Sequence, residues 1–520
     1  MTLTRKTILL FGIVNAALFS ALLPLWEGFD EAFHYGYVET LWQTRRLPVL
    51  GRTSLPYDVA ASFPLAPVSN VAKVAIPEAT AYGDWFALPA LERERRRRGV
   101  ERLTPDPRPI SRGNYEAHQS PLAYVVLAPP DWLLAKFPLT VRVLVLRLFC
   151  GMGAVVLLFL GASALCRVLE VPEPFANAAL FCIFSTEMLY ATTAHVANDW
   201  LAVGIGAPFL AALATYSRTP DRRSGLVASA WLAAGLLTKA YFLVFAGFAA
   251  GVAAMLIWRR RTRIRTILPG AALVVVLAGP WYTRNISLYG NAGGTPEAFG
   301  KIGIGQTLAA ATRVDWLAAG GYLARGSLWT GNNWFSSYSR TTLNVALGLL
   351  ALGIAAWVWH RRQIQSTERV VFGAMLLFLA GVGYEGCAMV AERGFQVAGP
   401  SPWYTQVLLV PAMALVCLGL SRWKRVGHLL AGAMVALWAW ILVATWTLKL
   451  FPMYAGGESS PMRARDVWRW WAHGAAAHAH DLSLTALAPA PWLYAGMVVS
   501  VALTVWLGVG RILALVKVRV

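Results

Sequence analysis

The chain has 520 residues, of which 57% are hydrophobic and only 14% are charged, and its mean hydropathy is +0.52. Soluble domains carry about a quarter charged residues, and a water-soluble protein of this composition would expose large apolar patches. The net charge of +20 lies largely in short clusters between apolar runs. That pattern is typical of membrane topology and contact with anionic lipid headgroups, and it argues against a nucleic-acid-binding domain.

Apolar runs near the roughly 20 residues needed to cross a bilayer recur along most of the chain. They predict an all-α, polytopic membrane protein with about twelve transmembrane helices, within a range of roughly 11–13. The first run follows Arg5 and Lys6, and no small-residue cleavage site comes after it, so it is interpreted as a signal anchor with a cytoplasmic N-terminus. The predicted spans cover residues 7–25, 139–166, 175–194, 200–216, 226–237, 241–258, 267–282, 343–359, 370–390, 406–420, 429–448 and 491–512.

Polar segments divide these spans into bundles and loops. In the long polar stretch after the first span, the apolar run 121–134 is too short to cross a bilayer and is broken by Pro129 and Pro130, which predicts a helix lying in the interface. The predicted organisation is a first transmembrane helix (1–25), a large extracytoplasmic first loop with interfacial helices (26–138), a transmembrane bundle (139–282), an extracytoplasmic loop (283–342), a second bundle (343–448), a third extracytoplasmic loop (449–490), and a last transmembrane helix with a cytoplasmic tail (491–520).

The distribution of basic residues indicates the orientation. Alternating sides from the N-terminus places most short basic clusters in cytoplasmic loops, as the positive-inside rule requires. The arginines at 93–98 lie outside, in a long loop that this rule scarcely governs, and they are interpreted as part of a solvated, salt-bridged helix. The three longest polar segments then share the outer face, which is where a functional site is expected.

The five cysteines predict neither a disulfide framework nor a zinc site. Each lies inside or at the end of an apolar run and none has CxxC spacing, so all are interpreted as small buried hydrophobic residues. Three histidines near 473–480 are better explained by an alanine-rich polar loop than by a metal site.

The densest polar constellation directly follows the first span and contains Asp30, Glu31 and His34. If a helix starts there, Asp30 and His34 are four residues apart and share a face. Two adjacent carboxylates at a membrane surface are costly unless they are solvated or paired. The segment is therefore either a helix cap in contact with headgroups or part of a functional site.

Further polar candidates lie in the closing part of the first loop or near the predicted outer ends of spans, where they share one face with Asp30. Each of them also has a purely structural explanation. The side chain could be solvated at the membrane boundary, could snorkel to the interface, or could anchor a helix there. Together, several carboxylates and cations at one interface suit an anionic lipid substrate with a polar reacting head. These candidates are His118 and Gln119, Asn198 and Asp199, Arg147, Lys239 and Arg284.

Along most of its length the chain resembles the GT-C superfamily of lipid-linked-sugar glycosyltransferases, and within it the bacterial family 39-type enzymes, the protein O-mannosyltransferases and the lipid A aminoarabinose transferases. The resemblance rests on the order and placement of five short motifs. These are Asp30-Glu31 followed by His34, Pro121-Leu122-x-Tyr124, Asn198-Asp199, Gly-Leu-Leu-Thr-Lys at 235–239, and Pro-Trp-Tyr-x-Arg-Asn at 280–285. Ser120 stands where members often have a second proline or a lysine.

The resemblance implies a GT-C fold and an inverting sugar transfer from a polyprenyl-phosphate carrier to an acceptor hydroxyl of a glycan, lipid or protein. In this family the base is an aspartate of the first loop, which matches Asp30, with Glu31 beside it in the catalytic pair. The expected phosphate-binding residues are Arg147, Lys239 and Arg284, and the expected substrate-binding residues are His34, His118, Gln119, Asn198 and Asp199. The leaving phosphate needs no general acid, so one carboxylate base and nearby cations suffice.

No cofactor is expected to be required, although Mg²⁺ or Mn²⁺ near Asp30 and Glu31 is left open. The expected location is a multi-pass position in the bacterial inner membrane, with the site facing the periplasm. Two alternatives stand beside the enzyme. A transporter or flippase for a lipid-linked sugar would share the charged cavity, but the sequence has no paired repeats. A non-catalytic assembly subunit would tolerate loss of the Asp30-Glu31 pair.

Overall fold

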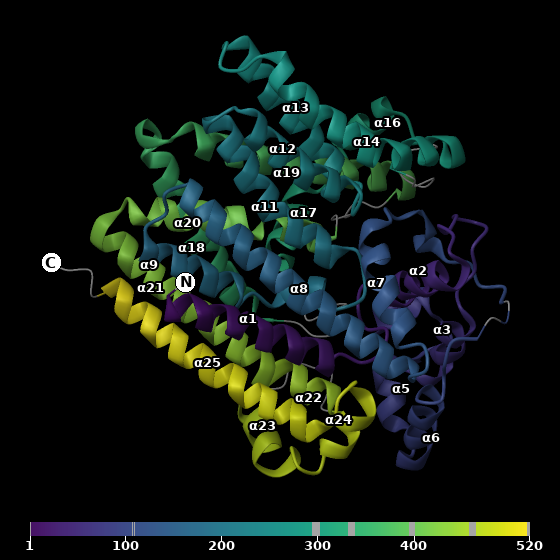
Figure 1. The fold of residues 1–520 in the computed structure, drawn as a ribbon. Coiled ribbons are helices and arrows are strands. Elements are labelled where there is room, and N and C mark those ends of the chain that lie inside the picture. Colours follow the sequence, from purple (N-terminus) through teal and green to yellow (C-terminus); the bar gives the residue numbers. More distant parts are fainter. Residues whose placement is uncertain are drawn as a thin grey trace.

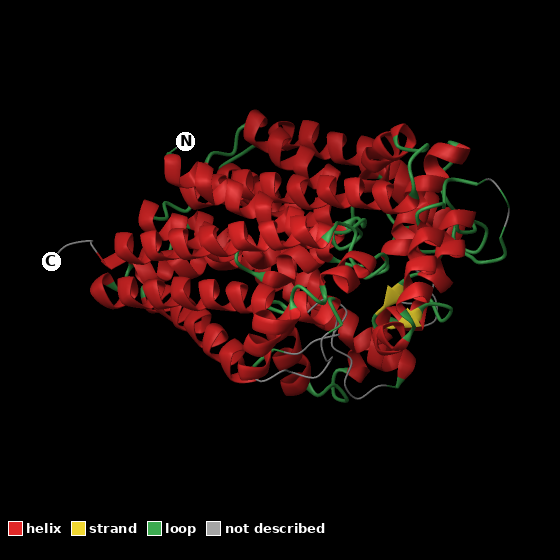
Figure 2. Cartoon of the chain, turned by 90° about the horizontal axis from the view of Figure 1, so that it is seen from below, coloured by secondary structure: helices red, strands yellow, loops and turns green. Residues whose placement is uncertain are grey.

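The computed structural model describes residues 2–106, 108, 110–293, 302–330, 338–394, 401–456 and 464–516. Most of this described chain is helical, and two short strands, β1 (Pro67–Val68) and β2 (Thr80–Ala81), pair in parallel within the first loop. Long helices lie side by side, and the shorter helices of the first loop gather at one end of them (Figures 1 and 2). The predicted all-α fold class is confirmed.

Nine described helical segments are long and apolar enough to cross a membrane. Apolar side chains on every face and satisfied backbone hydrogen bonds make such segments stable in lipid. The chain is therefore an integral, multi-pass membrane protein. The nine are α1 (Leu3–Leu22), α8 (Leu139–Val168), α11 (Asp199–Arg218), α14 (Ile264–Tyr289), α18 (Arg340–Trp359), α19 (Ser366–Arg393), η4 with α20 (Pro402–Leu408 and Leu409–Ser421), α21 to α22 through the π-helical η5 (Lys424–Ala444, Thr445–Leu450 and Phe451–Tyr454), and α25 (Ala490–Val516).

The three remaining predicted spans are also helical but differ in form. Helices α9 (Glu173–Ile183) and α10 (Glu187–Thr193) are long and apolar enough only when taken together, and they are bent by 57° at the break between them. Helices α12 (Arg222–Leu236) and α13 (Phe242–Trp258) have 15 and 17 residues. The predicted count of about twelve thus corresponds to twelve helical runs, nine of which have full spanning length within the described residues.

Several boundaries differ from the apolar runs because helices continue beyond the apolar surface. Helix α14 continues to Tyr289, so the polar residues after 282 extend the helix instead of starting a loop. The backbone hydrogen bonds of a helix can continue into a stretch of polar residues. A hydropathy plot therefore ends the predicted span before the helix itself ends. In contrast, α1 ends at Leu22, before the predicted end at residue 25.

The first loop folds into a compact helical layer at one end of the bundle (Figure 1). Helix α7 includes the run that was predicted to lie in the interface. The elements of the loop are α2 (Glu31–Thr44), α3 (Tyr57–Ser62), η1 (Phe63–Leu65), α4 (Asn70–Ala75), α5 (Tyr82–Ala87), α6 (Ala90–Val100), η2 (Tyr115–His118) and α7 (Leu122–Leu133).

The later polar segments lie at the same end as the first loop. Tyr289 at the end of α14 accepts a hydrogen bond from the Leu50 amide of the first loop. In the last polar segment, α24 (Ala479–Thr485) brings Asp481 to within 2.9 Å of Arg93 on α6. The described helices of these segments are α16 (Ile304–Ala310), α17 (Trp316–Gly326), α23 (Ala464–Arg469), the π-helical η6 (Trp470–Gly474) and α24.

Helix α6 carries the arginine run, and its charges are paired as the sequence indicates. Glu92 forms ion pairs with Arg95 and Arg96, and Glu101 pairs with Arg97. At the opposite end of the bundle, predicted cytoplasmic loops touch one another, and Arg261 donates to the carbonyl oxygens of neighbouring residues 217 and 218.

A fully buried cluster of charged side chains around Arg142 joins the first loop to α8. Arg142 of α8 contacts the carboxylates of Glu39 on α2, Asp58 on α3 and Asp131 on α7, at 2.8, 3.1 and 2.8 Å. Tyr35 of α2 also donates to Asp131. Three carboxylates around one guanidinium leave excess negative charge that burial makes costly. Burial, and next the charge of Asp58, raise the pKa of the Glu39 carboxyl well above its usual value.

Candidate functional site

Asp30 stands between α1 and α2 with its side chain open to solvent. The predicted helix start is confirmed, because Asp30 occupies the N-cap position of α2. Its backbone has the left-handed angles φ 54° and ψ 20°, which aspartate tolerates better than most residues. The side chain makes no capping hydrogen bond and accepts one from the Tyr115 hydroxyl instead. The carboxylate therefore points away from the helix that it precedes.

Electrostatics make Asp30 a stronger base than a free aspartate. The side chain of Asp30 is accessible to solvent on one side, but protein atoms surround it on its other sides. These atoms displace water from the carboxyl group, and this desolvation raises its pKa. The hydrogen bond from Tyr115 and the positive charge of Lys239 lower that pKa, and the charge of Asp199 raises it. The net direction is upward, which favours proton acceptance.

Glu31, the neighbouring carboxylate, is buried. It forms an ion pair with Arg147 and also accepts from the Val196 amide at 2.9 Å. Arg147 is itself fully buried, and its remaining donors reach the carbonyl oxygens of Leu23 and Pro24 at 2.6 and 2.8 Å. Every guanidinium nitrogen is thus occupied. This pair fixes the α1–α2 linker, and the catalytic role of Glu31 and the phosphate-binding role of Arg147 stay predictions.

The same linker is packed against the bundle so closely that Gly28 admits no side chain. A Cβ atom there would lie 2.6 Å from Cβ of His195. His195 is completely buried. The Phe29 ring meets it edge-on at 5.8 Å. The position of Asp30 is therefore set by packing on both sides of the linker.

A chain of hydrogen bonds joins η2 of the first loop to α11. Gln119 donates to the Glu116 carboxylate at 2.8 Å and accepts from Asn198 at 2.9 Å. Asn198 also donates to the Thr238 carbonyl oxygen at 3.2 Å. Burial, and next the charge of Asp30, raise the pKa of Glu116 to about 8. The predicted residues Gln119 and Asn198 are thus brought together within electrostatic reach of Asp30.

Lys239 and Asp199 form the second charged pair of the site. Lys239 follows α12, and its Nζ lies 2.5 Å from a carboxylate oxygen of Asp199 at the start of α11. The ammonium also lies over the rings of Tyr404 and Tyr241, at 5.1 and 5.8 Å from their centroids. Such cation–π contacts hold a desolvated ammonium without neutralising it. Lys239 therefore has one carboxylate partner and two aromatic neighbours.

The two predicted histidines have different environments. His34 is buried, and its Nδ1 lies 2.7 Å from the Tyr124 hydroxyl. Burial, and next the charge of Lys239, hold the pKa of His34 well below its usual range, so it is neutral. This favours a positioning role over substrate binding. His118 is half-buried, with Nδ1 2.8 Å from the Tyr115 carbonyl oxygen, and it lies at the edge of the site beside Gln119.

Arg284 lies on the continuation of α14 and keeps one donor unused. One of its guanidinium nitrogens donates to the Pro48 carbonyl oxygen at 2.7 Å, and the guanidinium lies 4.9 Å from the ring centroid of Trp281. Its other terminal nitrogen is buried without a partner among the described residues, as is the nearby Tyr37 hydroxyl. A buried unpaired guanidinium nitrogen is costly and suits an anionic ligand.

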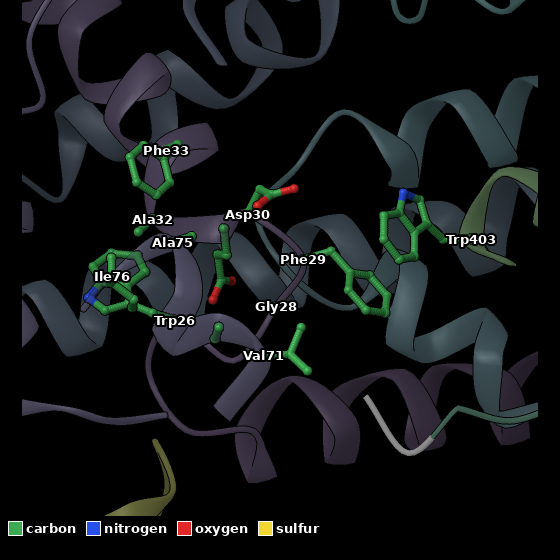
Figure 3. A pocket seen from close by; sticks show the side chains of 12 residues that line it. Trp26, Gly28, Phe29, Asp30, Ala32, Phe33, Val71, Ala75, Ile76 and Trp403 are labelled. Carbon is green, nitrogen blue, oxygen red and sulfur yellow. The ribbon is translucent and has the colours of Figure 1, made fainter. Parts of the chain in front are cut away.

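An open recess borders the exposed Asp30. It has about 480 Å³ of empty space, part of it continuous with solvent. Phe29 and Trp403 stack at one side with ring centroids 4.3 Å apart, and Trp26 lies at the other, with Asp30 between them (Figure 3). Asp30 thus faces an aromatic recess, and the Lys239–Asp199 pair acts on it electrostatically.

Five residues of this region were not predicted from the sequence. Tyr115 and Glu116 immediately precede the predicted His118, and their aromatic and acidic character beside it was the available signal. Trp403 and Tyr404 belong to η4 and reach the site from late in the chain, which no local pattern reveals. Glu385 of α19 lies within electrostatic reach of Lys239 and Tyr404, and a carboxylate inside an apolar run is itself a signal of function.

The described residues contain no group of three or more His, Cys, Asp or Glu side chains that is arranged to hold a metal ion. A divalent cation beside Asp30 and Glu31 stays an open prediction, and Glu31 is paired with Arg147. The side chain of His473 lies outside the described residues, while His478 and His480 contact acidic side chains of α24 and α6.

The chain shows a remote likeness to a solved structure. No family model matches the chain. No curated protein matches it in sequence. Three chains of solved structures match, among them ArnT from Cupriavidus metallidurans bound to undecaprenyl phosphate. That match has 14% sequence identity and a TM-score of 0.47, and it covers 99% of this chain and 76% of the ArnT chain. The function proposed below rests on the residues of the site.

Proposed function

We propose that the protein is a GT-C type inverting glycosyltransferase that moves a sugar from a polyprenyl-phosphate carrier to an acceptor hydroxyl on the extracytoplasmic side of the membrane. One observation carries the proposal. Asp30 is an exposed carboxylate, surrounded by protein and held by Tyr115, within electrostatic reach of the Lys239–Asp199 pair. A base and a cation are thus combined where the first loop meets the outer ends of the spans.

The reaction assigns each group a role. Asp30 accepts the proton of the acceptor hydroxyl as its oxygen attacks the anomeric carbon. The bond from that carbon to the phosphate oxygen breaks, and its electron pair leaves with the carrier, whose phosphodiester monoanion becomes a phosphomonoester dianion. Lys239 and Arg284 stabilise this added charge. A single displacement inverts the anomeric configuration, and a phosphate leaving group requires no general acid.

The hydrogen-bonded polar residues near Asp30 orient the substrates. Gln119, Asn198 and Asp199 offer amide and carboxylate groups for sugar hydroxyls, and half-buried His118 lies at their edge. Glu31, His34 and Arg147 act through packing, because each is buried and already paired. The acceptor and the donor sugar are proposed to bind at neighbouring surfaces on either side of Asp30.

The test uses the purified protein in lipid nanodiscs with radiolabelled polyprenyl-phosphate sugars, beginning with carriers of undecaprenyl phosphate, the lipid bound in the ArnT structure. Wild type should release or transfer label. Asp30→Asn should lower turnover by about 10²–10⁴-fold, the usual contribution of a general base. Asp84→Asn is the matched control, since Asp84 is exposed on α5 of the same loop, and its turnover should equal wild type.

Two outcomes contradict parts of the proposal. Near-normal turnover in Asp30→Asn would remove Asp30 as the base. Binding of the lipid-linked sugar by wild type without cleavage across the whole panel would favour a transporter or flippase.

A further inference from the structure

The recess beside Asp30 has a chemistry that restricts what can occupy it. Of the 12 residues that line it, only Asp30 and Glu31 carry ionisable side chains, and Glu31 is engaged by Arg147. Trp26 donates its indole N–H to Ser62 at 2.7 Å. The recess therefore offers an occupant one carboxylate and the indole of Trp403 as its polar side-chain partners.

The rest of the lining is apolar. Val71, Ala72 and Ala75 of α4, with the following Ile76, form a wall that carries no polar side-chain atom. Val71 is 48% exposed, so this apolar surface continues to the rim of the recess. Figure 3 shows Val71, Ala75 and Ile76 around the same space as Asp30.

We infer that this recess is the acceptor subsite and that it takes a membrane alcohol, meaning a single hydroxyl carried on an apolar body. The inference rests on the proposed function, because it names the acceptor of the same reaction. The hydroxyl meets Asp30, and the apolar body is buried against Phe29, Trp403 and α4. Burial of apolar area contributes about 25 cal/mol per Å².

Other acceptors fit this lining less well. A sugar acceptor brings several hydroxyl groups, and those that find no partner in an apolar recess each cost free energy on burial. A hydrophilic peptide brings backbone amides with the same penalty. The location also favours a bilayer-borne alcohol, because Asp30 follows the outer end of α1 after a short linker.

The transfer step balances without any further reactant. The alcohol O–H bond breaks with its proton passing to Asp30, the alcohol oxygen bonds to the anomeric carbon, and the phosphate leaves on the carrier. Water is the competing acceptor and gives free sugar. The ratio of glycosylated alcohol to free sugar therefore measures binding of the alcohol in the recess. This ratio does not depend on how fast the donor is cleaved.

The experiment compares Ala75→Phe, which fills the recess, with Val74→Phe on the same helix, whose side chain is 82% exposed and does not line the recess. Nanodisc-reconstituted enzyme receives its cleavable donor together with n-decanol, methyl glucoside or a hydrophilic serine peptide. Wild type and Val74→Phe should glycosylate decanol in preference to the other two. Ala75→Phe should lower the decanol-to-water product ratio at least tenfold. An unchanged ratio in Ala75→Phe, or preferred transfer to the glucoside or the peptide, would overturn the inference.

A second measurement separates this inference from the proposed function. A ten-carbon alcohol bearing a diazirine is photolysed with the protein without donor, and the labelled peptides are mapped by mass spectrometry. Labelling should fall on residues 71–76 and on Trp403, and Ala75→Phe should abolish it. Such labelling without any donor turnover would contradict the glycosyltransferase alone. Donor turnover without labelling at these positions would contradict the acceptor subsite alone.

Discussion

At the scale of single residues, the contact between Tyr115 and Asp30 is the first to test. The Tyr115 hydroxyl lowers the pKa of Asp30 against the larger upward effect of burial. Tyr115→Phe removes only that hydroxyl, so the pKa of Asp30 should rise further. The acid limb of kcat/KM should then move to higher pH.

The measurement is a pH–rate profile of both proteins with a cleavable donor. The two profiles should converge on the alkaline side, where Asp30 is deprotonated in both. An equal loss of activity at every pH would contradict a role for Tyr115 in tuning Asp30.

Arg147 allows a second prediction at this scale. Arg147→Met leaves the Glu31 carboxylate buried without its partner, which typically costs about 3–5 kcal/mol. The thermal unfolding midpoint should therefore fall markedly, and the double variant with Glu31→Gln should recover part of the loss. Unfolding is followed in detergent by tryptophan fluorescence. A normal midpoint with a raised KM for the donor would instead support the phosphate-binding role predicted from the sequence.

At the scale of elements, the buried cluster around Arg142 joins three helices of the first loop to α8. Glu39 binds its proton more tightly in the folded protein, because burial and Asp58 raise its pKa. The resulting contribution to stability is complete below the unfolded pKa of about 4.3 and is lost as pH rises toward the folded value. Glu39→Gln should therefore reduce the loss of stability between pH 5 and pH 9.

This is checked by unfolding midpoints at the two pH values. Glu101→Gln, at the exposed ion pair with Arg97 on α6, is the control and should keep the wild-type difference. If Glu39→Gln shows the same difference as well, the proton of Glu39 does not contribute to the pH dependence.

Helix boundaries belong to the same scale, and they show which part of a helix hydropathy does not predict. Hydropathy located all twelve apolar runs, but it ended the seventh at residue 282, whereas α14 continues to Tyr289. That continuation carries Arg284 and places it against Pro48 of the first loop. Hydrophobic periodicity detects the lipid-facing part of a helix, and the polar turn beyond it follows from tertiary contacts.

At the scale of the whole molecule, the bundle places the first loop and the last polar segment at one end and the basic loops at the other. The proposed orientation has the first loop outside. The native cysteines are all buried, so an introduced cysteine can be followed alone. Val74→Cys on α4 should react with a membrane-impermeant maleimide in intact cells or spheroplasts. Gln363→Cys, exposed between α18 and α19, should react only after permeabilisation. The reverse pattern would invert the topology.

The sequence by itself determined the membrane class, the helical runs, the large first loop and the position of Asp30 at the start of a helix, because each depends on local composition or on one turn of chain. It also identified Gln119, Asn198, Asp199 and Lys239 as candidates. Only the tertiary structure showed that Asp30 and Glu31 have different environments. The two residues are adjacent in the chain and both line the recess, yet Asp30 is exposed, whereas Glu31 is buried and paired with an arginine more than a hundred positions away. Burial and pairing are properties of the packed molecule, and no local pattern in the sequence shows that Glu31 is paired with Arg147 while Asp30 is not.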